Sequence, residues 1–211
     1  MGCDFYLFRH GQTDYNLSKQ MQGHLDIPLN STGILQAKEL AKNLSDVRFD
    51  YIYSSPLLRS VETVKIVSEK SNAKIIIDEG LKAWNFGIFC GKVVHLIDAP
   101  VDTTVYAHAD TCTDVYIPIA LVSNDDWAPQ NGESYNMFSK RVYDTIIKIT
   151  QNTDAKAIGI ATHGGVIKAI IKQFTDLEYP RDGIPNGEYM KMQWNGKKFI
   201  LVQTPSWLLT R

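Results

Sequence analysis

A histidine and an arginine stand side by side near the start of this sequence, directly after the apolar run Phe5–Phe8. An imidazole attacks phosphorus through an unprotonated ring nitrogen, and an ordinary histidine pKa of about 6.5 supplies that form at neutral pH. Phosphoryl transfer spreads negative charge over three equatorial oxygens, which guanidinium groups bind better than point charges do. We therefore predict that His10 is a nucleophile toward phosphorus and that Arg9 and Arg59 hold the phosphoryl oxygens.

A second histidine, His163, also follows an apolar run and is followed by Gly164 and Gly165. Its imidazole can donate to the same oxygens, and the glycines let backbone N–H groups approach an anion where a helix begins. A lone histidine is more often a core residue, and a Gly-Gly pair is more often a turn. The interpretation rests on the combination, because His10, Arg59 and His163 are all expected at element ends that meet at one edge of a sheet.

The elements that must position these residues alternate between strands and helices. Short apolar runs indicate buried strands, apolar spacings of three and four residues indicate helices, and Asn195-Gly196 predicts a terminal hairpin. The expected strands cover about 5–8, 50–53, 74–78, 156–162, 190–194 and 199–203, and the expected helices about 32–44, 57–68, 139–150 and 166–174. This order predicts an α/β fold, a three-layer α/β/α sandwich with a mostly parallel central sheet, and a ligand site at the carboxyl ends of the strands.

The segment Lys92–Gln130 does not fit this alternation, because it lacks clear periodicity and contains three prolines. A chain of 211 residues suits one sizeable core. We therefore expect residues 1–211 to form a single domain, with an insertion at about 92–130 that serves as a lid or side wall.

Composition argues against several other classes of protein. Twenty-two Lys and Arg against 23 Asp and Glu give a net charge of −1, which provides no global attraction for nucleic acid or an anionic membrane. Three widely spaced cysteines form no CxxC pair, which argues against a zinc site or a disulfide framework. No apolar run approaches the roughly 18 residues of a membrane span, so we expect a cytoplasmic protein without nucleic-acid or membrane partners. Composition predicts nothing about oligomeric state.

Several motifs recur in a fixed order along the chain. They are residues 7–13 (LFRHGQT) with Asn16, residues 22–30 (QGHLDIPLN), residues 53–60 (YSSPLLRS) with Glu62-Thr63, residues 131–134 (NGES) and residues 162–165 (THGG). Together they resemble the histidine phosphatase superfamily, also called phosphoglycerate mutase-like, and its phosphatases more than its glycolytic mutases. The resemblance covers nearly the whole chain except the insertion, and motifs in this order are far more specific than one Arg-His-Gly triplet.

The resemblance implies a reaction and a set of site residues. It implies a phosphohistidine on His10 that is then hydrolysed by water, a small phosphorylated substrate, and no metal or organic cofactor. The catalytic residues would be His10, Arg9, Arg59 and His163, and the substrate-binding residues would be Asn16, Gln22, Gly23 and Gly164.

Two positions depart from the family's pattern. The stretch that begins at Leu81 is similar to one in which the family places its general acid, a glutamate, at the position of Ala83, and a second family acid is replaced by Cys90. Protonation of an alkoxide leaving group contributes about 10²- to 10⁴-fold in rate, so alkyl phosphates would suffer more from this loss than aryl phosphates. A carboxylate of the insertion, such as Asp98 or Asp102, would be one replacement.

Three functions follow from these observations. The first is a phosphomonoesterase acting on a small phosphorylated metabolite, with an efficiency that depends on how the missing acid is replaced. The second is a phosphoglycerate mutase-type phosphotransferase, which retains its phosphoenzyme and returns the group to the substrate. The third is a non-catalytic protein that binds phosphorylated ligands without turnover, which the residues at positions 83 and 90 would explain.

Overall fold

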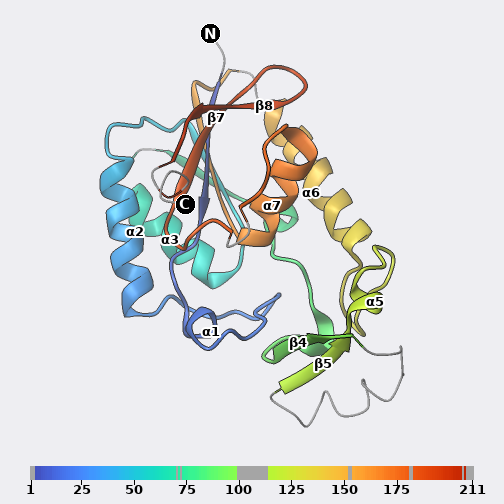
Figure 1. The fold of residues 1–211 in the computed structure, drawn as a ribbon. Helices are drawn as coiled ribbons and strands as arrows, with labels where there is room; N and C mark the ends of the chain where they lie inside the picture. Colours follow the sequence, from blue (N-terminus) through green and yellow to red (C-terminus); the bar gives the residue numbers. More distant parts are fainter. Residues whose placement is uncertain are drawn as a thin grey trace.

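The computed structural model describes residues 3–69, 71, 73–98, 114–151, 154–180, 183–205 and 207, and it places a six-stranded sheet at the centre (Figure 1). The strand order is β3-β2-β6-β1-β7-β8. The strands are β1 (Asp4–Arg9), β2 (Tyr51–Ser54), β3 (Lys74–Ile77), β6 (Ala157–Thr162), β7 (Tyr189–Trp194) and β8 (Phe199–Gln203). Strands β1, β6, β2 and β3 pair in parallel, while β7 and β8 form the antiparallel hairpin expected at the edge.

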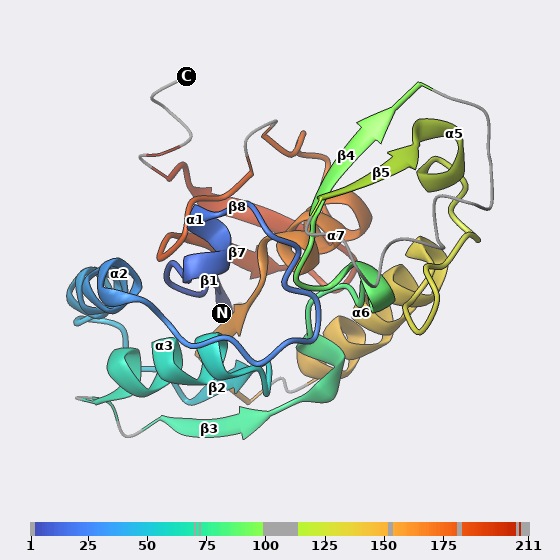
Figure 2. The same cartoon turned by 90° about the horizontal axis from the view of Figure 1, so that it is seen from below.

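Helices cover both faces of this sheet, as Figure 2 shows from the end of the molecule. On one face, α2 (Ser31–Asn43) and α3 (Leu58–Ser68) pack over a buried cluster that includes Phe8 and Ile52. On the other face, α6 (Tyr135–Thr150) and α7 (Gly164–Phe174) pack over a larger one. The three-layer α/β/α sandwich with a mostly parallel sheet is confirmed.

The segment 139–150, expected to be part of a long helix, lies within α6, which starts at Tyr135 because the Ser134 side chain accepts a hydrogen bond from the Met137 N–H and caps the first turn. Helix α7 begins earlier than the sequence predicts, at Gly164 rather than near Val166, directly after its N-cap residue, His163. This difference brings the helix N-terminus against the predicted site.

A second, two-stranded sheet lies within the predicted insertion. Strands β4 (Val93–Ile97) and β5 (Asp114–Pro118) pair in parallel, and the short helix α5 (Ile119–Val122) follows. Their apolar side chains pack in a small separate cluster around Phe89. The sequence missed these strands because much of β4 is exposed and lacks a regular apolar repeat. Asp102 lies outside the described residues.

The remaining elements are short, and they lie near the carboxyl ends of the parallel strands. They are α1 (Asp14–Leu17) and the 3₁₀ turns η1 (Glu79–Leu81) and η2 (Gly87–Phe89). In Figure 1, β1 points toward the end of the molecule where α1 and the small sheet lie. Within the described part of the chain, none of the helices has the length and apolar character needed to cross a membrane.

Candidate active site

His10 lies immediately beyond the carboxyl end of β1, and its backbone N–H donates to the Thr162 carbonyl at 3.1 Å. The side chain is only 3% exposed. Its Nδ1 lies 2.7 Å from the carbonyl oxygen of Gly11, which can only accept, so Nδ1 carries the proton of the neutral ring. Nε2 is therefore the nitrogen with a free lone pair.

His163 stands beside His10 at the end of the neighbouring strand, β6. The two ring centroids are 5.1 Å apart with an interplanar angle of 58°. Arg59 Nε donates to His163 Nδ1 at 3.3 Å, which places the ring proton on Nε2, and Nε2 donates to Ser55 Oγ at 2.8 Å. Both nitrogens of this ring are thus engaged by protein groups, which fix its orientation.

Both imidazoles are neutral at neutral pH. Burial holds the pKa of His10 well below its usual value, and the positive charges of Arg59 and Arg9 lower it further. Burial also holds the pKa of His163 well below its usual value, with Arg59 as the largest charge acting on it. A neutral His10 keeps the Nε2 lone pair available for attack on an electrophile.

Arg59 sits in the first turn of α3, as expected, and its guanidinium is almost completely buried, with 1% of the residue exposed. It donates to the Gly23 carbonyl at 2.9 Å and to the Leu25 carbonyl at 2.8 Å, in addition to His163. Burial lowers its pKa to about 10, so the group stays positively charged at neutral pH. The Arg59 side chain therefore links His163, and with it the histidine pair, to the loop before α2.

Arg9 is held from the opposite side of the pair, where its NH1 donates to the Ile184 carbonyl at 2.6 Å. Its buried Nε has no acceptor among the residues that the structure describes. A Cβ built on Gly164 would lie 3.5 Å from this Nε, so the start of α7 lies directly against the guanidinium. No side chain caps that helix. An arginine donor and a helix N-terminus together favour an anion at this point.

Of the other predicted binding residues, Asn16 lies in α1, and Gln22 and Gly23 lie in the loop that follows it. Asn16 Oδ1 accepts from the Thr13 N–H at 3.1 Å, and Gln22 Oε1 accepts from Thr13 Oγ1 at 3.0 Å. Gly23 has a φ of +49°, and a Cβ there would collide with Cys90 Sγ. Only glycine suits that backbone and that space. Gly23 thus lies against Arg59 and Gly164 against Arg9, whereas Asn16 and Gln22 are hydrogen-bonded to Thr13.

Sequence reasoning missed three residues that hold the site together. Ser55 accepts from His163, and Asn186 Nδ2 donates to the His10 carbonyl at 3.0 Å. The Tyr179 hydroxyl donates to the Gly164 carbonyl at 3.2 Å. Ser55 belongs to the Ser-Ser-Pro stretch after β2 and has a recognisable position, whereas Asn186 and Tyr179 lie in an irregular stretch with no motif of their own.

The segment that contains Ala83 is anchored by its backbone. The Ala83 carbonyl accepts from His24 Nε2 at 2.9 Å and from Arg141 NH2 at 3.2 Å. Arg141 also forms a two-pronged ion pair with Glu133, both contacts being 2.8 Å. Burial raises the pKa of Glu133, but the hydrogen bonds from Arg141 and from the Asn85 N–H outweigh it and leave that pKa below its usual value. Glu133 is therefore ionised and is a poor proton donor.

Two further residues bear on the missing acids. Asp98 follows β4 and is exposed, and its role as a replacement acid stays a prediction. Cys90 is a free thiol, and burial raises its pKa, which keeps it protonated and unreactive. Within the described ranges, no group of three or more metal-ligating side chains comes together.

Comparisons with known proteins identify the family of this chain and several relatives. Residues 5–205 match the family described as histidine phosphatase superfamily (branch 1). The chain is 28% identical over 200 residues to the uncharacterized phosphatase PhoE of Bacillus subtilis, covering 92% of each protein. It is 30% identical to glucosyl-3-phosphoglycerate phosphatase of Mycolicibacterium vanbaalenii, covering 85% of this chain and 76% of that one. The crystal structure of the alpha-ribazole phosphatase from Shigella flexneri superimposes with a TM-score of 0.75 at 25% identity and covers 96% of both chains.

Proposed function

The chain belongs to the histidine phosphatase superfamily (branch 1), and from this premise we propose that it is a phosphomonoesterase that works through a phosphohistidine on His10. The relatives named above include phosphatases of small phosphorylated metabolites, which supports a substrate of that size. The observation that carries the proposal is the tautomer of His10. Because Nδ1 donates to the Gly11 carbonyl, Nε2 is left unprotonated and would be the nitrogen that attacks phosphorus.

In the proposed reaction, His10 Nε2 attacks phosphorus while the bond from phosphorus to the ester oxygen breaks. The leaving oxygen takes the bonding electrons and acquires a proton, and the phosphoryl group remains on Nε2. A water molecule then attacks phosphorus, which releases inorganic phosphate and the free imidazole. Arg9 and the N-terminus of α7 at Gly164 would hold the equatorial oxygens, with Asn16, Gln22 and Gly23 completing the pocket.

Arg59 and His163, the two remaining site residues, are hydrogen-bonded to each other, which limits their direct contacts with a phosphoryl group. Arg59 already uses three of its donor directions on Gly23, Leu25 and His163, so its contribution is a fixed positive charge as well as any direct contact. His163 would donate to a phosphoryl oxygen only when Nε2 exchanges Ser55 for that oxygen. We assign the whole chain to one functional unit, with the segment 92–130 as a side wall of the pocket.

Phosphoprotein labelling, stopped with alkaline detergent so that an acid-labile phosphohistidine survives, tests this proposal directly. After incubation with a radiolabelled phosphate donor, the wild-type protein should carry acid-labile, base-stable label and should release inorganic phosphate, whereas His10→Ala should do neither. The control is His95→Ala, because His95 is an exposed histidine on β4 and its loss should leave both signals intact.

Each of the other outcomes has a distinct meaning. Equal labelling of His10→Ala and wild type would disprove the assigned nucleophile. Ligand binding without label or turnover would establish the non-catalytic alternative, and isomerisation of a phosphoglycerate without phosphate release would establish the mutase.

A further inference from the structure

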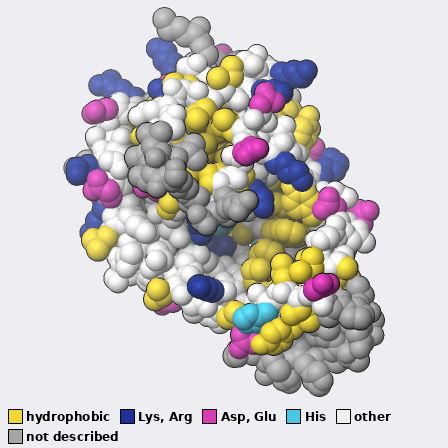
Figure 3. Space-filling view, viewed as in Figure 1, with side chains coloured by type: hydrophobic (Ala, Val, Ile, Leu, Met, Phe, Trp, Pro, Cys, Tyr) yellow, Lys and Arg dark blue, Asp and Glu magenta, His cyan; other side chains and the backbone are white. Residues whose placement is uncertain are grey.

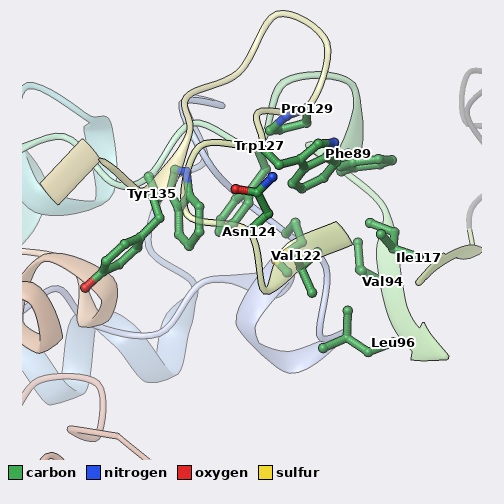
Figure 4. A pocket seen from close by; sticks show the side chains of 12 residues that line it. Phe89, Val94, Leu96, Ile117, Val122, Asn124, Trp127, Pro129 and Tyr135 are labelled. Atoms are coloured by element: carbon green, nitrogen blue, oxygen red, sulfur yellow. The ribbon is translucent and has the colours of Figure 1, made fainter. Parts of the chain in front are cut away.

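An aromatic cavity of about 200 Å³ lies between the Ala83 segment and the small sheet (Figure 4). Its aromatic lining comes from Trp84, Phe86, Phe89, Trp127 and Tyr135. Apolar side chains of β4, β5 and α5 form the opposite side. In the space-filling view, hydrophobic side chains gather above the small sheet on this face of the molecule (Figure 3).

The cavity shares a wall with the candidate active site. Met21 lines the cavity, and two residues later the Gly23 carbonyl accepts from Arg59. A Cβ at Gly23 would lie 3.2 Å from the Phe86 nitrogen, so the loop with the arginine-bound carbonyl packs against the segment with the cavity's aromatic residues. Trp84 directly follows Ala83. The cavity is therefore separated from Arg59 by a single loop, residues 21–23, which places it close enough to be considered as the binding site of a leaving group.

The chemistry of the lining selects the kind of leaving group. Of the described residues that line the cavity, none carries a formal charge, and the polar groups are those of Asn124, Tyr135 and the two indoles. Burying a carboxylate or an ammonium in such surroundings without a partner is strongly unfavourable, so a charged leaving group is disfavoured. An engineered apolar cavity of about 150 Å³ binds benzene, so this cavity has room for one aromatic ring system.

We infer that this cavity binds the uncharged aromatic leaving group of an aryl phosphate monoester, and that this class is the preferred substrate of the phosphatase activity proposed above. Two independent observations lead here, the aromatic cavity and the alanine at position 83. A phenol has a pKa of about 10, against about 15.7 for water as a guide to an alkyl alcohol, so a phenolate leaves without a proton donor.

The reaction balances without a general acid. The phosphorus–oxygen bond breaks as His10 Nε2 attacks, the electron pair remains on the phenolic oxygen, and solvent protonates the phenolate after it leaves. Hydrolysis of the phosphohistidine then consumes one water and returns His10 to its starting state. The net reaction is aryl phosphate plus water to phenol plus inorganic phosphate.

Three substrates separate the contributions of the cavity and of the leaving group. Phenyl phosphate has both the ring and a good leaving group, benzyl phosphate has the ring but an alkoxide leaving group, and acetyl phosphate has a good leaving group but no ring. We expect phenyl phosphate to exceed benzyl phosphate in kcat by about 10²- to 10⁴-fold, the usual contribution of leaving-group protonation. We expect acetyl phosphate to be hydrolysed with a KM at least about tenfold above that of phenyl phosphate, because it fills no aromatic pocket.

Binding measurements test the cavity without turnover. Phenylphosphonate, which cannot be hydrolysed, should bind at least about tenfold more tightly than methylphosphonate. Trp127→Ala should remove most of that difference, and Leu96→Ser, a milder change at a 55% exposed lining residue, should reduce it in a variant that keeps its fold. The matched control is Tyr116→Ala, because Tyr116 lies on β5, is 53% exposed and stacks on His95 outside the cavity.

The outcomes distinguish this inference from the function on which it rests. The aromatic site would be disproved, but not the phosphatase activity, if acetyl phosphate were hydrolysed while the two phosphonates bound with equal affinity. Unchanged phosphonate affinities in both lining variants, again with hydrolysis of acetyl phosphate, would have the same meaning. A kcat for benzyl phosphate as high as that for phenyl phosphate would overturn the reaction without a general acid. Failure to turn over any of the three substrates would overturn the proposed phosphatase itself.

Discussion

Replacing Arg59 with lysine tests whether one buried guanidinium both holds the site together and drives its chemistry. Arg59→Lys keeps the positive charge but has a single nitrogen for the three acceptors that now surround the group, the Gly23 and Leu25 carbonyls and His163 Nδ1. A lysine can satisfy one of them well. The other two acceptors remain buried with weakened or missing partners.

The expected cost follows from those two lost contacts. A hydrogen bond to a charged group contributes about 1.5–3 kcal/mol, so the loss of two, partly recovered by relaxation, should lower the free energy of unfolding by about 2–4 kcal/mol. In a domain of this size such a loss lowers Tm by roughly 4–16 °C. Turnover should fall by about 10²- to 10³-fold, the usual effect of removing one preorganised donor, because the lysine no longer fixes Gly23 and His163 around the phosphoryl group.

Urea unfolding measures the first effect, and hydrolysis of phenyl phosphate, well below the melting temperature, measures the second. Asp50→Ala is the control, because Asp50 also holds backbone groups, the Lys156 and Ala157 N–H, but does so at the end of β6 opposite His163. Its loss of activity should follow only its unfolded fraction. If Arg59→Lys retained wild-type stability and turnover, or if both variants lost activity in proportion to stability, the role assigned to Arg59 would be wrong.

Two further predictions concern proton supply and pH. Ala83→Glu should raise kcat for benzyl phosphate about 10- to 100-fold and leave kcat for phenyl phosphate nearly unchanged. Ala83→Gln introduces a side chain of the same size that cannot donate the proton, so it should raise kcat for neither ester. Steady-state kinetics on the two esters tests this prediction. The free energy of unfolding should fall by about 2–3 kcal/mol as the pH is lowered from about 7.5 to about 5.5. In the unfolded chain His10 and His163 are protonated near pH 6.5, whereas burial lowers their pKa in the folded protein, so protonation favours the unfolded state in this range. Urea titrations at both pH values measure this loss, which His10→Asn should roughly halve; a slope that stays the same in that variant would contradict a buried neutral His10.

The central part of the site could be predicted because its position depends on local signals. The apolar runs before His10 and His163 form adjacent parallel strands, with Arg9 opposite Thr162 in the register, so the residues that follow them must meet. Arg59 was expected near the start of its helix and lies in the first turn of α3. These inferences need only strand burial, helix periodicity and the rule that parallel strands end at the same edge.

The contacts that the sequence did not reveal depend on long-range geometry. Asn186 reaches the His10 carbonyl across 176 positions of the chain, and nothing in its neighbourhood signals that contact. The free Nε2 of His10 likewise follows from the distance between Nδ1 and the Gly11 carbonyl, which no spacing rule supplies. Strands β4 and β5 were not predicted for a related reason, because their pairing depends on packing around Phe89 and β4 has no regular apolar repeat.

The alanine at the position where the resemblance implies a general acid and much of the aromatic lining of the cavity belong to a single segment, residues 83–90. Ala83 begins it, Trp84, Phe86 and Phe89 line the cavity, and Cys90 ends it against Gly23. The backbone of this segment is fixed, because the Ala83 carbonyl is held by His24 and Arg141 and the Trp84 indole donates to the Glu133 carbonyl at 2.8 Å. A glutamate at position 83 would therefore project from a backbone of fixed position, and the aromatic residues that line the cavity would stay in place. If the two properties are separate, Ala83→Glu should add alkyl phosphates to the substrate range without weakening the binding of phenylphosphonate.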